Sequence, residues 1–558
     1  MNRKNEKSKF RIWQAWASVI ALLLVTELIA AGIERAGLIK GQGQAADAGL
    51  TSQAAEEAQQ TKGAEDMQTQ ADSDDSQEQA GQDSPQVKAA EDVSQPQTDR
   101  KDSQEQAARE STQSTAKTES VQSQEVQEPQ EPAQEASDGR SASAGNLSHE
   151  GYTLSKVVVL SRHNIRSPLS GAGSVLQTMT PHEWHAWSSN PSELSLRGGV
   201  LETEMGQFFR KWLESENLFP ENYHPGEEEV RIYANSKQRT IATAKYFTAG
   251  LLPTADTWIE TQVEYDQMDP VFTPQFVFMS DAYAAAVRDQ VMDLYEDRIE
   301  GLSDNYEVLA RVLDLEESES FQSGQVPMFR TDDTDLILKE DAEPGVTGSL
   351  KTACSASDAL VLQYYEEPDP NKAAFGDDLR HEDWASISEI KDVYGDVLFT
   401  APLVAPHVAN PLLEEIQSEL EEPGRRFTFL CGHDSNISSV TAALGVEDYR
   451  LPDALEKTPI GCKLVFSEWR DVDDSSWMSV DLVYQSEDQL RQCPLLDLEN
   501  PPAVYNLSLE GLERNADGLY GSDAVMERLY DAIGEFDRIM QEYAPDEWQQ
   551  MEEEDEAA

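Results

Sequence analysis

Short, unbroken apolar runs alternate with longer segments of helical periodicity from about Gly151 onward. The first run, at 157–160, is apolar at every position, which is typical of a strand buried on both faces of a sheet. In residues 200–213 the apolar side chains fall on one helical face, which predicts an amphipathic helix. Two further pairs follow, with strands at 230–234 and 427–431 and helices at 240–247 and about 435–444.

This alternation predicts an α/β domain over residues 149–545, with a mostly parallel sheet flanked by helices. Residues from about 275 to 400 are richer in helical patterns and in acids, which indicates an inserted, smaller α-helical subdomain. Segments 463–466 and 477–484 flank a turn rich in Asp and Ser, so they predict a β-hairpin.

The first 40 residues have the pattern of an export segment. A basic head precedes an apolar stretch that is interrupted at Glu27. Residues 12–33 are predicted to be either a cleaved signal peptide or an uncleaved anchor that tethers the protein to the membrane. Both alternatives predict an extracytoplasmic protein, which is either secreted or anchored to the outer face of the cytoplasmic membrane.

Residues 41–148 lack Phe, Trp and Tyr and are rich in Gln, Glu, Ser and Ala. The hexapeptide DSQEQA occurs in them twice, at 75–80 and 102–107. Such a segment cannot bury enough apolar surface to offset its chain entropy, so we expect a disordered acidic spacer. The acidic C-terminal residues 546–558 are predicted to form a solvated tail.

The chain has 105 acidic and 43 basic residues, and most of the negative charge falls after residue 150. This excludes a nucleic-acid partner, because such binding depends on Lys and Arg that neutralise phosphates. The even number of cysteines is compatible with disulfides or with free buried thiols, and no Cys/His cluster predicts a metal site. The cysteines are Cys354, Cys431, Cys462 and Cys493.

Polar and charged residues follow three of the predicted strands at the point where each strand ends. The sequences are RHNIRSP at 162–168, NSKQRT at 235–240 and GHDSN at 432–436. Because the carboxyl ends of neighbouring parallel strands meet at one edge of a sheet, we expect these side chains to converge. The converging residues are Arg162, His163, Arg166, Arg239, His433 and Asp434.

This set suits a phosphate dianion, because a guanidinium group pairs with two phosphate oxygens at once and helix N-termini add amide donors. A neutral imidazole can attack phosphorus and form a covalent intermediate, which is the role predicted for His163. Asp434 can protonate the leaving oxygen and then act as a base toward water. The chain has no Walker A loop, kinase motif set or evident carboxylate cluster for magnesium, so we expect neither metal nor cofactor.

Each motif is weak in isolation. RHNIRSP alone also fits a capped turn in which Pro168 opens a helix, and Asp434 alone fits a helix N-cap. His433 alone fits a core histidine, and Arg239 alone fits a surface or salt-bridging helix residue. The three motifs together, each just after an apolar strand, favour the phosphate site.

At these residues the chain resembles the histidine acid phosphatase family, whose signature is RHGxRxP followed later by HD. Asn164 stands where the family usually has glycine. The glucose-1-phosphatase branch of the family has the same asparagine at this position. The resemblance covers about residues 151–545. Stretches similar to that branch are GGVLETEMGQFFRKWL at 198–213, YANSKQRTIATAKYF at 233–247, MDPVFTP at 268–274, LQYYE at 362–366 and TPIGCKLVF at 458–466.

The resemblance implies a phosphoglycerate-mutase-like α/β domain capped by a smaller α domain, with the site between them, no metal and an acidic pH optimum. It implies that His163 is the nucleophile and that Asp434 is the proton donor. Glu366, at the end of LQYYE, is similar in position to a substrate-binding carboxylate, but Glu367 replaces the usual following glycine, and an ordinary helix-end acid fits equally well. The residues implied to bind phosphate are Arg162, Arg166, Arg239 and His433.

We therefore expect an exported acid phosphomonoesterase that hydrolyses small sugar phosphates, such as glucose 1-phosphate, through a phosphohistidine intermediate. Two alternatives stay open. One is a phytase-type inositol phosphate phosphatase, which needs a wider and more basic pocket. The other is an inactive surface protein that binds phosphorylated ligands. The export segment argues against a relative of the cytosolic phosphoglycerate mutases.

Overall fold

The computed structural model describes residues 147–170 and 174–550. The predicted export segment 1–40, nearly all of the predicted spacer and residues 551–558 therefore lie outside the described residues. In the described part of the chain, no helix combines the length and the apolar character that a membrane crossing requires. Residues 545–550 are helical and Trp548 packs against the core, so the tail predicted from residue 546 begins inside a helix.

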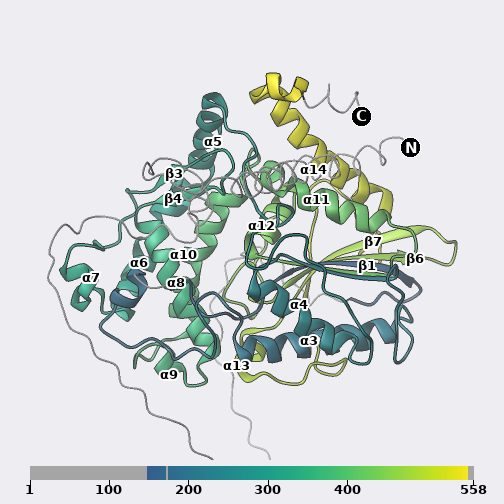
Figure 1. Cartoon of the computed structure of the whole chain (residues 1–558), viewed down its shortest axis with the longest axis horizontal. Coiled ribbons are helices and arrows are strands. Elements are labelled where there is room, and N and C mark those ends of the chain that lie inside the picture. Colours follow the sequence, from purple (N-terminus) through teal and green to yellow (C-terminus); the bar gives the residue numbers. More distant parts are fainter. Residues whose placement is uncertain (1–146, 171–173, 551–558) are drawn as a thin grey trace, which may run out of the picture. The chain divides into compact units, whose positions relative to one another are not determined.

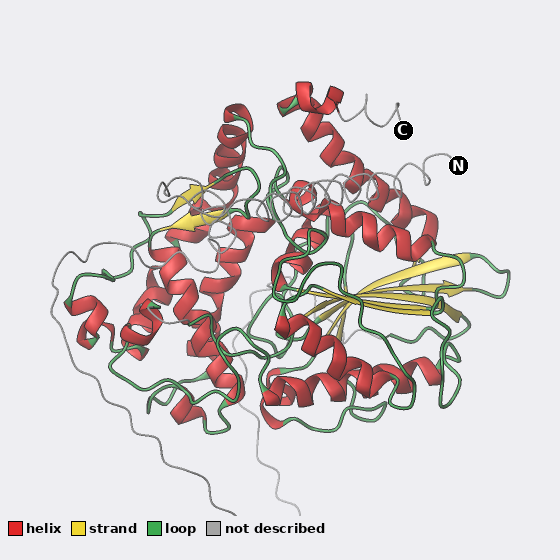
Figure 2. Cartoon of the chain, viewed as in Figure 1, coloured by secondary structure: helices red, strands yellow, loops and turns green. Residues whose placement is uncertain are grey.

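Within the described residues, seven strands form one sheet (Figures 1 and 2). Their order is β2-β5-β1-β6-β7-β8, and β9 pairs with β7. A separate two-stranded sheet, β3 (Asp335–Ile337) with β4 (Gly345–Thr347), was not predicted. The strands of the main sheet are β1 (Thr153–Arg162), β2 (Val230–Ala234), β5 (Phe427–Gly432), β6 (Lys463–Arg470), β7 (Ser476–Tyr484), β8 (Ala503–Asn506) and β9 (Tyr520–Gly521).

The main sheet is mixed, which corrects the prediction of a mostly parallel sheet, whereas the α/β class is confirmed. Strands β2 and β1 each run parallel to β5, but β6, β7, β8 and β9 add antiparallel pairings. The predicted hairpin is present as β6 and β7. A short turn can join only antiparallel neighbours, because parallel ones need a long crossover. The short turn between β6 and β7 meets this condition, and β8 and β9 each pair antiparallel with β7.

Helices cover both faces of the main sheet (Figure 2). Alternate residues of β1 point to opposite faces, so Val157 and Val159 join one core cluster, while Val158 and Leu160 join the other. All four side chains are fully buried, as predicted for this apolar run. The first face is covered by α3 (Leu196–Ser215) and α4 (Gln238–Leu251), and the second by α11 (Ala405–Glu421), α12 (Asp434–Ala443) and α14 (Ser522–Tyr543).

Residues 281–399 contain a group of helices that lies beside the sheet (Figure 1). These helices share a continuous hydrophobic core in which Val287, Leu309, Leu360 and Ile390 are fully buried. They are α5 (Asp281–Glu300), α6 (Ser303–Val312), α7 (Glu319–Gln322), α8 (Ser349–Glu366), α9 (Pro370–Ala373) and α10 (His381–Phe399). The remaining short helices are α13 (Glu487–Gln492) and the 3₁₀ turns η1 (Val175–Thr178) and η2 (Leu315–Glu317).

All four cysteines lie in the described part of the chain, and all four are free thiols. Cys354, Cys431 and Cys462 are buried, and Cys493 is half-buried. Of the two alternatives left open by the sequence, the structure therefore has the free thiols. Burial raises the pKa of Cys462 to about 12, so this thiol is protonated and unreactive at neutral pH.

Candidate active site

Three parallel strands end together and carry the predicted residues to one edge of the sheet. Strand β5 lies between β2 and β1, and the register pairs Arg162 of β1 with Gly432 of β5. Beyond the strand ends, the backbone N–H of His163 donates to the carbonyl of Gly432, and that of Asn235 donates to the carbonyl of Cys431, each at 3.0 Å. These bonds fix the first residue of each loop, so the loop after β1 and the loop after β2 start from the same central strand.

The His163 side chain is buried and is held as a neutral imidazole. Its Nδ1 lies 2.9 Å from the carbonyl oxygen of Asn164. Because a carbonyl can only accept, Nδ1 carries the proton and the lone pair is on Nε2. Burial lowers the pKa of His163 well below its usual 6.5, and the positive charges of Arg239 and Arg166 lower it further. A neutral imidazole with its lone pair on Nε2 is the form that attacks phosphorus.

Three arginines surround this imidazole, and all three are buried. Arg162 is 1% exposed, Arg239 is 6% exposed and Arg166 is 8% exposed. Arg162 Nη1 donates to Glu456 Oε1 at 2.8 Å, and Arg166 Nη2 donates to Asp358 Oδ2 at 3.1 Å. Buried guanidinium groups need such partners, because an uncompensated buried charge is costly. The carboxylates therefore stabilise the cluster of arginines in the protein without ligand.

His433 lies next to His163, with 5.5 Å between the ring centroids. The Nδ2 of Asn235 is 2.8 Å from His433 Nε2. The orientation of this amide follows from its other end, where Oδ1 accepts from the backbone N–H of Asp269 at 3.1 Å. Asn235, from the loop after β2, therefore anchors the second histidine ring beside the first.

Asp434 is the first residue of α12, and its side chain is one-third exposed. Its Oδ2 lies 2.9 Å from Lys391 Nζ and 3.3 Å from Arg162 Nη2. Burial acts to raise the pKa of this carboxyl, but the charges of Lys391 and Arg162 outweigh burial and hold the pKa well below its usual 3.8. Asp434 is therefore ionised when no ligand is bound.

Asn164, the residue after the histidine, joins this loop to a fully buried ion pair. Its Nδ2 donates to Glu202 Oε2 at 2.8 Å, and Glu202 Oε1 lies 2.7 Å from Lys463 Nζ. Its Oδ1 accepts from the backbone N–H of Ile165 at 2.8 Å, which fixes the amide orientation. Gly461 has a φ of +68°, and a Cβ at this position would lie 2.4 Å from Asn164 Nδ2. The Asn164 side chain therefore requires glycine at position 461.

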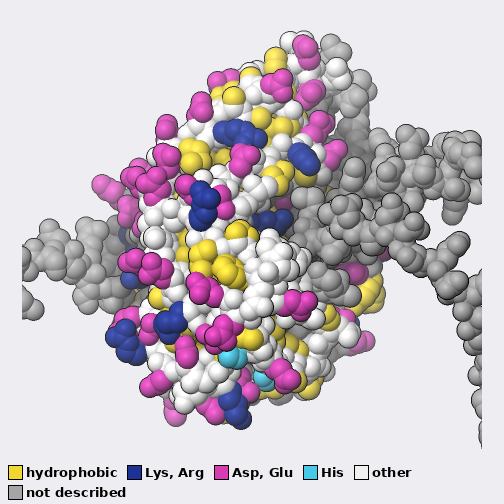
Figure 3. Space-filling model, turned by 90° about the vertical axis from the view of Figure 1, so that its left-hand side faces the viewer, with side chains coloured by type: hydrophobic (Ala, Val, Ile, Leu, Met, Phe, Trp, Pro, Cys, Tyr) yellow, Lys and Arg dark blue, Asp and Glu magenta, His cyan; other side chains and the backbone are white. Residues whose placement is uncertain are grey.

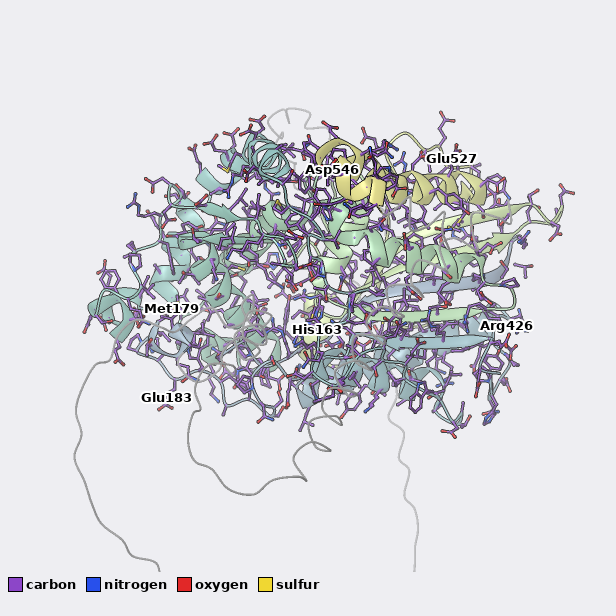
Figure 4. All side chains as sticks on the ribbon, turned by 45° about the horizontal axis from the view of Figure 1, so that its top comes forward. His163, Met179, Glu183, Arg426, Glu527 and Asp546 are labelled. Carbon is purple, nitrogen blue, oxygen red and sulfur yellow. The ribbon has the colours of Figure 1, made fainter. Side chains whose placement is uncertain are left out.

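A cavity of about 530 Å³ opens beside His163 and extends to the helices of residues 281–399. Figure 4 shows His163 and Met179, both of which line the cavity. Leu169, Val175 and Phe399 supply apolar wall. Its charged lining residues are Arg166, Arg239, Lys351, Lys391 and Lys457, together with Glu343, Asp358, Asp392, Asp396 and Asp434.

Three charged residues at this site were not found from the sequence. Lys391 and Asp358 come from α10 and α8, and Glu456 comes from the loop before β6. The Nζ of Lys391 lies 3.0 Å from Glu456 Oε1 and 3.4 Å from Asp358 Oδ1. Lys391 and Asp358 are single charged residues in a strongly acidic chain, and no motif surrounds them. For Glu456, the signal available in the sequence was the EKTP segment at 456–459, which directly precedes the IGCKLVF stretch.

The structure brings six of the seven predicted site residues together, but not Glu366. Glu366 is the last residue of α8 and is not among the residues that line the cavity. Its Oε2 accepts from Ser195 Oγ at 2.7 Å, and Ser195 also caps the N-terminus of α3. Burial raises the pKa of Glu366. Of the two readings that the sequence left open for Glu366, this contact with Ser195 favours the ordinary helix-end acid over the substrate-binding carboxylate.

Across residues 147–170 and 174–550, no group of three or more His, Cys, Asp or Glu side chains has the arrangement of a metal site. The Lys and Arg residues of the cavity occupy the places between its carboxylates.

Figure 3 shows acidic side chains over the face of the molecule that includes the helices of residues 281–399, with scattered Lys and Arg between them. The cluster of buried arginines around His163 therefore contrasts with an acidic surface.

Comparisons with known proteins agree with this geometry. The family model described as "Histidine phosphatase superfamily (branch 2)" matches residues 153–485. A glucose-1-phosphatase from Salmonella typhimurium is 38% identical over 385 residues, which cover 68% of this chain and 92% of that protein. Phytase AppA from Escherichia coli is 29% identical over 389 residues, covering 66% and 89%. The apo structure of Hafnia alvei phytase has a TM-score of 0.63 and 27% identity, covering 69% of this chain and 98% of that one.

Proposed function

The chain belongs to the histidine phosphatase superfamily (branch 2), and we propose that it is an acid phosphomonoesterase that hydrolyses small sugar phosphates through a phosphohistidine. The observation that carries this proposal is the buried neutral imidazole of His163, surrounded by three buried arginines and His433, with Asp434 at the same cavity.

In the first step, Nε2 of His163 forms a bond to phosphorus while the bond from phosphorus to the ester oxygen breaks. Arg162, Arg166 and Arg239 bind the phosphate oxygens, since guanidinium groups match their geometry and neutralise their charge. The imidazole of His433 is the fourth side chain that binds the phosphate oxygens. Because Nδ1 of His163 already donates to the carbonyl of Asn164, the ring does not need to change tautomer before it attacks.

The leaving oxygen takes a proton from Asp434. In the second step a water molecule transfers its proton to the Asp434 carboxylate and attacks phosphorus, and the bond to His163 breaks. The products are an alcohol and inorganic phosphate. Bound phosphate carries negative charge close to Asp434, which opposes Lys391 and Arg162 and raises the pKa of this carboxyl. Substrate binding therefore promotes the protonated form that the first step requires.

The charges of the cavity favour one phosphate over several. Outside the arginine cluster, the cavity is lined by cationic Lys351 and Lys457 together with acidic Glu343 and Asp396. Carboxylates accept hydrogen bonds from sugar hydroxyls but repel further phosphate groups. The higher identity to glucose-1-phosphatases than to a phytase supports the same substrate class. An inositol phosphate phosphatase remains the second candidate, because the solved relatives include phytases.

We also propose that the enzyme acts outside the cytoplasm, as the basic and apolar pattern of the first 40 residues predicts. Residues 12–33 serve either as a cleaved signal or as a membrane tether. Fractionation of cells that express the full chain, with N-terminal sequencing of the product, distinguishes these two alternatives.

The test is a panel of phosphate esters assayed across pH, with and without EDTA. We expect a higher kcat/KM for glucose 1-phosphate than for phytate, no effect of EDTA, and phosphate trapped on His163 during turnover. His163→Ala should be folded and inactive. A preference for phytate of tenfold or more would support the phytase alternative, and an active His163→Ala enzyme would refute the mechanism.

A further inference from the structure

Lys391 belongs to the group of helices in residues 281–399 and contacts Asp434 directly. It lies in the third turn of α10, and its side chain is 14% exposed. Its Nζ contacts three carboxylates, with Asp434 Oδ2 at 2.9 Å, Glu456 Oε1 at 3.0 Å and Asp358 Oδ1 at 3.4 Å. These carboxylates come from α12, the loop before β6 and α8. One ammonium group therefore connects four separate segments at the site.

The same carboxylates bind the arginines of the site. Glu456 Oε1 is 2.8 Å from Arg162 Nη1, and Asp358 Oδ2 is 3.1 Å from Arg166 Nη2. Lys391 is thus the cation shared by Asp434 and by the partners of both arginines. Of the three carboxylates, Asp434 lies nearest to Lys391 Nζ, so a change in the charge at Lys391 acts directly on the pKa of Asp434. Asp434 is also the most exposed of the three.

We propose that Lys391 is a positioning residue that holds Asp434 at the cavity and sets the pH range over which Asp434 protonates the leaving group. This inference rests on the proposed function, because it assigns the range in which the proton donor works. The physical basis is that an opposite charge in direct contact stabilises the ionised carboxylate, so the proton is lost at lower pH. The enzyme thereby gains an acidic working range.

Other groups facing Asp434 act in the same network. Arg162, at the end of β1, contacts the same Oδ2 at 3.3 Å, and the imidazole of His163 interacts with it electrostatically. From α8, Asp358 acts in the opposite sense through its negative charge. Within α12, the backbone N–H of Ser435 donates to Asp434 Oδ1 at 3.0 Å. Glu456 is held by both Lys391 and Arg162, which partly offsets their positive charge.

Lys391 is separable from the phosphate-binding groups in a way that Arg162 is not. Arg162 donates to the backbone carbonyl of Thr458 as well as to Glu456, and it is 1% exposed. Replacing it would remove a phosphate ligand and a structural contact together. Lys391→Met removes the ammonium group and keeps the length of the side chain, so it changes mainly the electrostatics at Asp434.

The experiment measures kcat/KM against pH for two substrates, glucose 1-phosphate and p-nitrophenyl phosphate. The first has a poor leaving group that needs a proton, and the second has an activated one that does not. For glucose 1-phosphate, activity falls as pH rises through the pKa of the donor. In Lys391→Met this fall should move to higher pH by about one to three units. For p-nitrophenyl phosphate the profile should move little.

Matched variants separate this role from others. Lys391→Arg keeps the charge and should restore the wild-type profile, and Lys351→Met removes another lysine of the cavity and should leave the midpoint unmoved. In the Asp434→Asn background, Lys391→Met should produce no shift. Lys391→Gln, which keeps a hydrogen-bond donor for Glu456, gives the same measurement if the methionine variant fails to fold.

An unmoved midpoint in folded Lys391→Met or Lys391→Gln would overturn the inference. So would a shift of equal size with both substrates, or a rise in KM without a shift, which would indicate direct substrate binding. The proposed function has its own readout in the same assays, because it fails if His163→Ala remains active. Failure of the Lys391 inference with inactive His163→Ala would leave the proposed function intact.

Discussion

Replacing Lys463 by methionine tests how the loop that carries His163 is held in place. Lys463 Nζ lies 2.7 Å from Glu202 Oε1 and donates to the carbonyl of Gly461 at 2.7 Å. Both charged side chains are fully buried, and Glu202 in turn accepts from Asn164. The substitution removes the cation and keeps most of the aliphatic volume, so it leaves Glu202 as a buried carboxylate without its counter-ion.

The magnitude follows from the burial of this pair. At 2.7 Å and an effective dielectric constant of about 20, the attraction is about 6 kcal/mol, which is offset by several kcal/mol for the desolvation of each ion. Breaking one side of such a pair costs about 3–5 kcal/mol of stability. Glu202 can escape part of this cost by taking up a proton. Burial already raises its pKa, and loss of Lys463 raises it further.

The sign of the pH dependence is then fixed. A carboxyl whose pKa is raised in the folded state binds more protons folded than unfolded, so stability falls as pH rises from the unfolded pKa toward the folded one. The destabilisation of Lys463→Met should therefore be large at pH 7 and smaller near pH 5. The unfolded carboxyl has a pKa of about 4.3.

The assay is urea unfolding followed by tryptophan fluorescence at both pH values, on four proteins. Glu202→Gln/Lys463→Met should recover most of the lost stability, because the glutamine carbonyl still accepts from Asn164 and no buried charge remains. Arg330→Met, which breaks an exposed pair with Asp332, is the control and should leave the urea midpoint unchanged. If the double variant is as unstable as Lys463→Met, or if that loss is independent of pH, the reasoning is wrong.

Three further predictions concern activity. Because the neutral imidazole is the active form and the pKa of His163 is held well below 6.5, kcat/KM for p-nitrophenyl phosphate should not halve as pH is lowered through 6.5; a midpoint near that value would indicate an unperturbed imidazole. Asp434→Asn should lower kcat/KM for glucose 1-phosphate by about 10²–10⁴-fold and much less for p-nitrophenyl phosphate, whereas equal losses would assign Asp434 a capping role. Glu366→Gln should change thermal stability but not the ratio of kcat/KM for the two substrates, because Glu366 accepts from Ser195 outside the cavity; a selective loss with glucose 1-phosphate would restore the substrate-binding role.

Strands β1, β2 and β5 and the residues at their ends were predictable because both depend on local sequence. A stretch of strand buried on both faces is mostly apolar, so the run at 157–160 predicts a buried strand. The site residues follow such runs directly, and neighbouring parallel strands bring their ends together. The structure places Arg162, His163 and His433 in this way. Their clustering also requires that the three strands are neighbours, and the order β2-β5-β1 meets that condition.

The parts that were not predicted depend on segments far apart in the chain. The mixed sheet arises because β6 pairs antiparallel with β1, and no local pattern specifies which strand a hairpin will join. Lys391 reaches Asp434 only through the packing of α10 beside α12. For Glu366, the motif identified the residue, but the direction of its side chain depends on the position of Ser195 at the start of α3.

The charges around His163 and Asp434 also indicate how the phosphate group of the substrate takes part in protonation of the leaving group. The cations of the site stabilise the neutral form of His163 and the ionised form of Asp434. The first is the form that attacks, but the second is the wrong form for donating a proton. The negative charge of a bound phosphate dianion opposes the effect of the cations on Asp434, so it raises the pKa of Asp434 and favours its protonated form. The same phosphate places its phosphorus atom next to Nε2 of His163, which attacks it. A ligand without that charge would leave Asp434 ionised, which makes protonation of the leaving group depend on the phosphate itself.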